Sequence, residues 1–119
     1  MRQAFAHDAV LVMEADADLR APCGAVTAAL CGHWDHEPPC PLAPHHSRTA
    51  RAASEVHVRI LFAAEQGMET TIRQRIESAL SSGQLHSPDG VITRWQLRSS
   101  RHSDVRAEEM DHAERLIRI

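Results

Sequence analysis

The sequence predicts an α+β fold, in which an antiparallel sheet is covered by helices mainly on one face. Three observations support this class. Residues 55–63 and 91–98 alternate between apolar and polar side chains, as half-buried strands do. Apolar residues recur at helical spacing over residues 68–80. Helix patterns also lie between strand patterns along the chain, so that helices are expected to cross from one strand to the next.

The first half of the chain contains one predicted strand and one predicted helix. Residues 9–15 form an apolar run with two β-branched valines, too short for a good helix, and are expected to be a buried strand. Residues 21–31 are expected to be a helix, because proline stands near its start and glycine follows its end. After a brief edge strand at residues 33–36, four prolines predict an irregular segment over about residues 37–54.

The second half is more regular. Residues 55–63 and 91–98 are the two alternating strands, residues 68–80 are a helix, and residues 87–90 have the composition of a turn. A charged helix is expected over residues 103–119, with oppositely charged side chains four positions apart. This order of elements matches a ferredoxin-like split β-α-β arrangement with an extra C-terminal helix.

Length and composition restrict the classes of protein that are possible. The chain has 119 residues, which fits a single domain. A net charge of −3 and only four aromatic side chains argue against a nucleic-acid partner, which would require a basic surface or a stacking platform. The longest apolar runs, Ala9–Met13 and Ile60–Ala64, are far too short to span a bilayer, so no membrane association is expected.

The amino-acid usage also indicates a source and a compartment. Lys, Asn and Tyr, whose codons are rich in A and T, are absent, so we expect a GC-rich bacterial genome. No signal-peptide pattern is visible, and three cysteines are therefore expected to be reduced thiols in the cytoplasm. A homodimer is expected as one option, because a small sheet commonly leaves a face or an edge to be covered.

One segment concentrates side chains that bind metals. Six of the twelve Cys and His residues lie between Cys31 and His46. Thiolate and imidazole bind zinc and copper well, and a Pro-Pro bend could turn a cysteine back toward the histidines. The sequence therefore predicts a transition-metal site, for zinc in the first place and copper in the second, with ligands drawn from Cys31, His33, His36, Cys40 and His45.

Other interpretations of this segment remain open. It could be a His-rich surface loop with incidental thiols, in which case the protein would be a non-enzymatic module that binds another protein or dimerises. Cys31 and Cys40 could instead form a disulfide. In a third hypothesis the protein is a small metal-dependent hydrolase with Glu37 as the general base. No residue is assigned a catalytic role by the sequence.

A weaker pattern combines arginine, serine and histidine over residues 98–103, before the last predicted helix. These groups could bind an anion at the start of that helix. The favoured interpretation is an ordinary helix cap at Ser103 beside a solvent-exposed basic strand. On the predicted strand at residues 55–63, His57 is expected to point outward.

Overall fold

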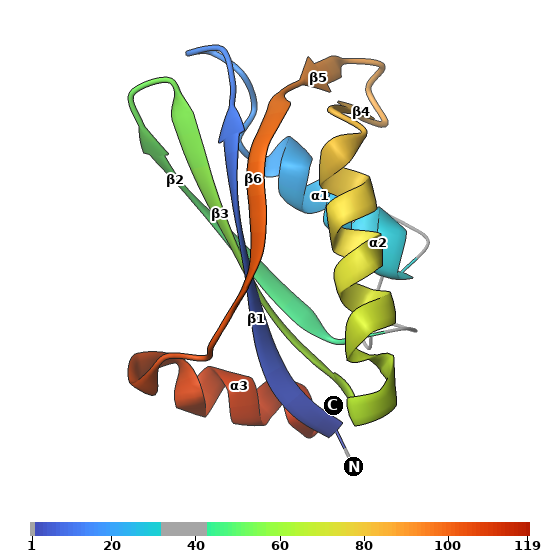
Figure 1. Ribbon diagram of the computed structural model, residues 1–119. Helices are drawn as coiled ribbons and strands as arrows, with labels where there is room; N and C mark the ends of the chain where they lie inside the picture. Colours follow the sequence, from blue (N-terminus) through green and yellow to red (C-terminus); the bar gives the residue numbers. More distant parts are fainter. Residues whose placement is uncertain (1, 32–42) are drawn as a thin grey trace.

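The computed structural model describes residues 2–31 and 43–119, drawn as ribbons in Figure 1. Within these residues, four antiparallel strands form the main sheet in the order β2-β3-β1-β6. Their bounds are Arg2–Val12 for β1, His45–Ala52 for β2, Glu55–Glu65 for β3 and Gln96–Ser103 for β6. Two short strands, β4 (Gln84–His86) and β5 (Ile92–Arg94), form a separate hairpin. The helices described are α1 (Arg20–Cys31), α2 (Glu69–Ser81) and α3 (Met110–Ile117), with single 3₁₀ turns at Gln66–Met68 and Ala107–Glu109.

The hydrophobic core lies between the main sheet and the helices α1 and α2 (Figure 1). Strands β1 and β3 pair with Ala9 opposite Val58, so alternate residues of both strands point toward these helices. Burial removes the largest of these side chains from water completely, and this apolar contact is the main stabilising contribution. The fully buried members of the core include Leu11, Val26, Val56, Ile60, Phe62, Ile72, Ile76 and Leu80.

The third helix packs on the opposite face of the sheet. Leu116 and Ala113 of α3 are buried, and Leu116 belongs to a small apolar cluster with Ala6, Leu61 and Ala63. These strand residues alternate with those of the main core, so they point away from α1 and α2. Figure 1 shows α3 at one end of the sheet only. The other half of this face keeps exposed side chains on β2, β3 and β6.

The predicted α+β class and antiparallel sheet are confirmed, but the segment at about residues 37–54 departs from its expected irregular structure. Strand β2 occupies His45–Ala52 and pairs along its whole length with β3. Its sequence has no apolar alternation, because only one face is partly covered. The turn from β2 to β3 also lacks the usual glycine or asparagine signal, and Ala53 takes the positive φ of 57°.

The predicted strand at residues 91–98 is divided into two. The alternation places Val91 and Trp95 on the inner side of this strand, but Val91 is exposed, and β5 pairs with β4 in a hairpin that the sequence did not predict. Trp95 is buried as expected, and its indole N–H donates to the carbonyl of Leu80 over 2.8 Å. Strand β6 then continues to Ser103, so the predicted start of the last helix at this residue is wrong, and α3 begins only at Met110.

Candidate functional site

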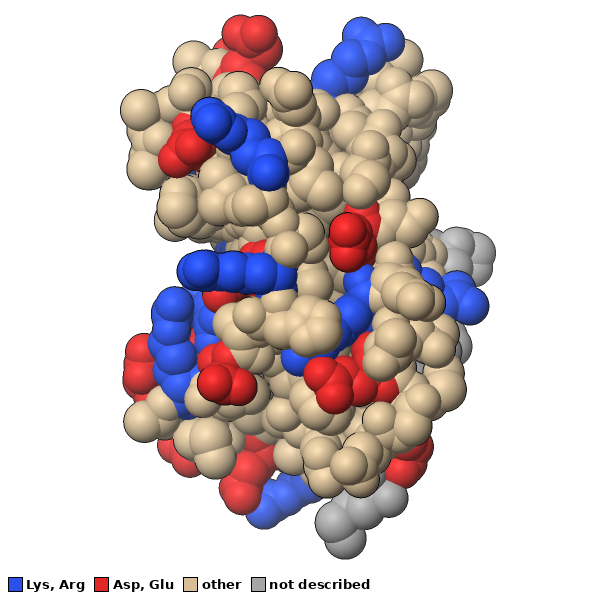
Figure 2. Space-filling view, viewed as in Figure 1, with Lys and Arg blue, Asp and Glu red and all other residues tan. Residues whose placement is uncertain are grey.

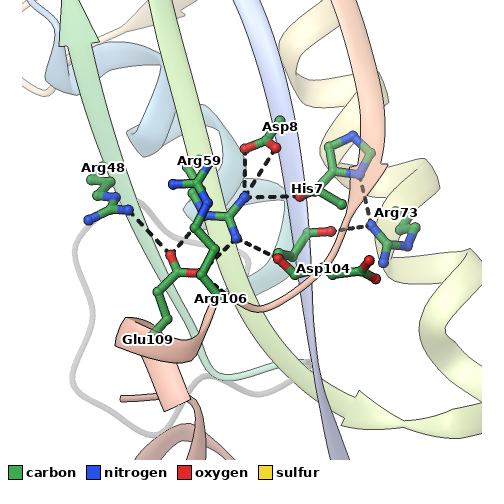
Figure 3. Close-up of polar contacts among 10 residues, drawn as sticks. His7, Asp8, Arg48, Arg59, Arg73, Asp104, Arg106 and Glu109 are labelled. Carbon is green, nitrogen blue, oxygen red and sulfur yellow. Dashed lines mark hydrogen bonds and ion pairs between the residues drawn. The ribbon is translucent and has the colours of Figure 1, made fainter. Parts of the chain in front are cut away.

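An arginine at the centre of the sheet organises the face that carries α3. Arg59 lies in the middle of β3, points away from the main core, and is only 7% exposed. Its Nε and Nη2 donate to the two carboxylate oxygens of Glu109, each over 2.7 Å, and its Nη1 donates to Asp8 over 3.0 Å (Figure 3). Glu109 ends the turn before α3, so this ion pair fixes the helix to the sheet.

The remaining donors of Arg59 are also occupied. Its Nη1 donates to the Ser103 hydroxyl over 3.0 Å, and its Nη2 donates to the carbonyl of Asp104 over 2.7 Å. A guanidinium has five N–H groups, and all of them are used here. Arg59 is therefore a structural side chain, with no donor left for an external ligand.

The charges in this cluster stabilise one another. The hydrogen bonds from Arg59 are the largest cause that lowers the pKa of Glu109, to about 2, and burial opposes them. The same bonds raise the pKa of Arg59, so both groups are ionised at any physiological pH. A buried ion pair is acceptable only when its remaining hydrogen-bonding groups are also satisfied, and this condition is met.

Next to this cluster, the uncovered half of the sheet forms a hollow of about 620 Å³. We call it the sheet hollow. Figure 2 shows arginine side chains at the left of the molecule, above the place of α3 in Figure 1, with acidic groups beside them. All four strands of the main sheet and the segment before α3 contribute to its lining, which includes Asp8, Val10, Arg48, Ala50, His57, Arg59, Ser99, Arg101 and Arg106.

Two arginines of the sheet hollow have charges that no described carboxylate pairs with. Arg101 and Arg106 are exposed and form no ion pair with any residue that the structure describes. Asp8 lies opposite Arg101 on the neighbouring strand, but its carboxylate is already bound to Arg59. Arg48 is 55% exposed and shares Glu109 with Arg59 at a longer distance of 3.3 Å. The hollow is therefore electropositive.

The rest of the lining leaves space and supplies polar groups. Val10 and Ala50 are the cross-strand neighbours of His57, and both are small, so the middle of the hollow stays open. His57 is 56% exposed and its Nε2 lies 3.8 Å from a carboxylate oxygen of Glu55. Ser99 adds a hydroxyl at the β6 side. A partly apolar floor with several cationic groups suits a small organic anion.

A second polar cluster lies on the other face of the sheet, against α2. His7 is buried, its Nε2 is 2.7 Å from the hydroxyl of Ser100, and its Nδ1 is 3.1 Å from Nη1 of Arg73. Because a guanidinium only donates, Nδ1 must accept, and the proton of the neutral ring is on Nε2. Nε2 therefore donates to Ser100 and cannot remove its proton. This geometry excludes a Ser-His nucleophile of the usual kind.

The predicted metal site is not supported. His45 has its ring nitrogens near other groups, with Nε2 at 2.9 Å from the Thr27 hydroxyl and Nδ1 at 3.0 Å from the Ala43 carbonyl. Within residues 2–31 and 43–119, no group of three or more His, Cys, Asp and Glu side chains could hold a metal ion. The prediction that this protein functions by binding a metal is therefore wrong for the part of the chain that the structure describes.

The other predicted ligands fall on a part of the chain that is not described. His33, His36 and Cys40 lie outside the described residues, as does Glu37, the predicted base. Cys31 ends α1, and its side chain is not among those described. Zinc as a cofactor stays a prediction that this structure does not test.

The sequence pointed to part of the sheet hollow and missed the rest. For residues 98–103 anion binding was considered, but a helix cap was the favoured interpretation. Ser99 and Arg101 line the hollow from a strand and not from a helix start. Arg48, Arg59 and Glu109 were not singled out. An arginine inside the apolar run of β3 was a usable signal, because such a position requires a buried acidic partner.

Comparisons with protein-family models, curated proteins and solved structures found no match. Among the described residues, no helix has both the length and the apolar character needed to cross a membrane. The interpretation of this chain therefore depends on its own geometry.

Proposed function

We propose that this protein binds a small organic anion in the sheet hollow. One observation carries the proposal: Arg101 and Arg106 line this concave surface without an ion pair among the described residues. The nearby carboxylates of Asp8 and Glu109 are already bound to Arg59. A bound carboxylate or phosphate would supply the missing charge through charge-assisted hydrogen bonds, which are stronger than neutral ones.

The same surface does not favour a nucleic acid. The whole chain has a net charge of −3, and no Phe, Trp or Tyr lines the hollow, so bases would find no stacking platform of the usual kind. In the view of Figure 2, basic and acidic side chains alternate instead of forming one basic stripe. A compact anionic ligand matches this distribution better than a long polyanion.

The predicted homodimer remains a proposal, and the charges restrict how it could form. Two copies packed hollow to hollow would bring Arg101 and Arg106 of both copies together, which repels. The outer edges of β2 and β6 are the other surfaces open to a second copy or to another protein, because each ends the four-stranded sheet. A dimer formed through the edge of β2 or through the edge of β6 would leave the hollow free for a ligand.

We also propose that the architecture is the ferredoxin-like split β-α-β arrangement expected from the sequence. Strand β3 lies between β1 and β2, which α1 connects, and β6 pairs with the outer side of β1. This order supports the proposal. The hairpin of β4 and β5 and the helix α3 on the opposite face are additions to it.

The proposed function can be tested by isothermal titration calorimetry at low salt with citrate and inorganic phosphate as probes. We expect binding that weakens by about tenfold in Arg101→Ala and in Arg106→Ala, because each removes a charge-assisted hydrogen bond. Arg94→Ala is the matched control, since Arg94 is exposed on β5 and does not line the hollow. Equal losses of affinity in all three variants, or an affinity that none of the substitutions changes, would reject the proposal.

A further inference from the structure

The charges around the sheet hollow indicate how many charges its ligand carries. Four arginines line it, and two carboxylates, those of Asp8 and Glu109, are bonded to them. Glu55, two residues before His57 on β3, pairs with Arg98 at 3.5 Å, so this second pair adds no net charge. The hollow thus has a surplus of two positive charges, which matches a ligand with two negative charges better than one with a single charge.

His57 is the side chain in the hollow that can add a further charge near neutral pH. The arginines stay protonated at all physiological pH values, and imidazole is the group that titrates in this range. Its cross-strand neighbours are Val10 and Ala50, so a ligand on the floor of the hollow would lie against the ring.

The groups that face His57 set its response to a ligand. On its own strand, Glu55 is 3.8 Å away and Arg59 is committed to Glu109 and Asp8. Arg48 on β2 and Arg101 on β6 contribute positive charge, whereas Arg98 on β6 is paired with Glu55. A bound anion would lie beside the ring, and its negative charge would favour the protonated imidazole.

We propose that the sheet hollow selects dianions and that His57 takes up a proton when such a ligand binds. This inference depends on the proposed function of the hollow. Its ligand is a dicarboxylate or a phosphate monoester, which share the required charge. By linkage, an anion that favours the protonated ring must bind more tightly as the pH falls.

Charge selection can be measured with probes that share one ring. Isophthalate and phenyl phosphate carry two charges at about pH 8, whereas benzoate carries one. We expect both dianions, or one of them, to bind the wild-type protein roughly tenfold more tightly than benzoate. The tighter dianion tells a dicarboxylate site from a phosphate site. Benzoate binding as tightly as both dianions overturns the inference.

Proton uptake is tested with isophthalate alone, because its carboxylates stay ionised between about pH 6 and pH 8. We expect its affinity for the wild type to rise several-fold toward about pH 6, and to be independent of pH in His57→Gln. His46→Gln is the control and should keep the rise, since His46 does not line the hollow. Circular dichroism at both pH values checks that each variant is folded.

The results separate the two proposals. If the wild type binds citrate or inorganic phosphate but none of these aromatic probes, this inference is wrong and anion binding stands. If it binds no anion at all, the proposed function is wrong and this inference falls with it. If isophthalate binds but His57→Gln keeps the full pH dependence, the role of His57 is wrong and anion binding stands.

Discussion

At the scale of single residues, burial and hydrogen bonds decide which ionisable groups can act. His7 sits in the core with Arg73 as a neighbour, and burial, followed by this positive charge, lowers its pKa to about 4. Burial likewise raises the pKa of the Cys23 thiol to about 11, which makes it a poor nucleophile. The exposed groups of the sheet hollow, by contrast, are accessible to a ligand.

The buried imidazole of His7 makes stability depend on pH. Its folded pKa of about 4 lies below the ordinary value of 6.5, so protonation favours the unfolded chain. The contribution of His7 to stability should be constant above about pH 6.5 and fall by roughly 3 kcal/mol as the pH drops to about 4. Urea unfolding over this range measures the loss. His7→Gln should flatten the curve, and the exposed His86→Gln should not; equal slopes in both variants would contradict this account.

The Arg59 cluster predicts a second residue-scale effect. Arg59→Met leaves the buried carboxylate of Glu109 without its main partner, and we expect a loss of about 3–5 kcal/mol in the free energy of unfolding. Arg48→Met is the matched control, because Arg48 contacts the same carboxylate but is half-exposed and lies farther away, at 3.3 Å. Its loss should stay below about 1 kcal/mol. Chemical denaturation of both variants tests the difference, and similar losses would show that the cluster contributes little.

At the scale of elements, α3 is attached to the sheet by few contacts. It has eight residues, and its buried side chains are Ala113 and Leu116. A helix of this length is not stable alone, so its docking depends on these apolar contacts and on the ion pair of Glu109 with Arg59. Arg106, which lines the sheet hollow, belongs to the segment that leads into this helix. Loosening α3 should therefore alter the hollow.

Leu116→Ala tests this dependence. The cavity it creates should cost about 2–3 kcal/mol, and the amide protons of α3 should exchange faster, while those of α2 keep their rates. Met110→Ala is the control, since Met110 is 53% exposed on the same helix. Hydrogen exchange read by mass spectrometry separates these segments. Faster exchange in α2 to the same extent would mean that α3 is not an independent unit.

At the scale of the whole molecule, the two faces of the sheet have different roles. The face toward α1 and α2 is a closed apolar core, and the other face is half covered by α3 and half open with unneutralised arginines. Positive charges held together in the folded chain repel each other. A bound anion therefore stabilises the folded state as well as occupying the hollow.

This repulsion gives a prediction about thermal stability. Millimolar isophthalate should raise the melting temperature of the wild type at low salt by a few degrees, and added sodium chloride should reduce the gain through screening. The double variant Arg101→Ala, Arg106→Ala should show little gain. Differential scanning fluorimetry provides the measurement. A gain that persists in the double variant would place the stabilising anion elsewhere.

Much of the secondary structure could be read from periodicity, and the exceptions have physical causes. The alternation of residues 55–63 and the helical spacing of residues 68–80 correspond to β3 and α2, because alternate residues of β3 and one face of α2 enter the main core. Strand β2 left no such pattern, since it is an edge strand with polar residues on both faces. The hairpin of β4 and β5 is too short to produce a periodic signal.

The candidate site was predicted less well than the fold. Concentration of His and Cys in the sequence suggested a metal centre, but closeness along the chain does not determine where side chains meet. The Nε2 atom of His45 lies 2.9 Å from the Thr27 hydroxyl of α1. The arginines of the sheet hollow come from β2, β6 and the segment before α3, and nothing along the chain connects them.

The sequence by itself determined the class of the fold, since apolar periodicity depends only on local order along the chain. It also determined the charges available, with arginine as the only strongly basic side chain. Only the tertiary structure decided which of these charges are neutralised. Arg59 forms ion pairs with Asp8 and Glu109 because strand pairing and the docking of α3 bring three distant segments within hydrogen-bonding distance. Arg101 and Arg106 are left facing the solvent.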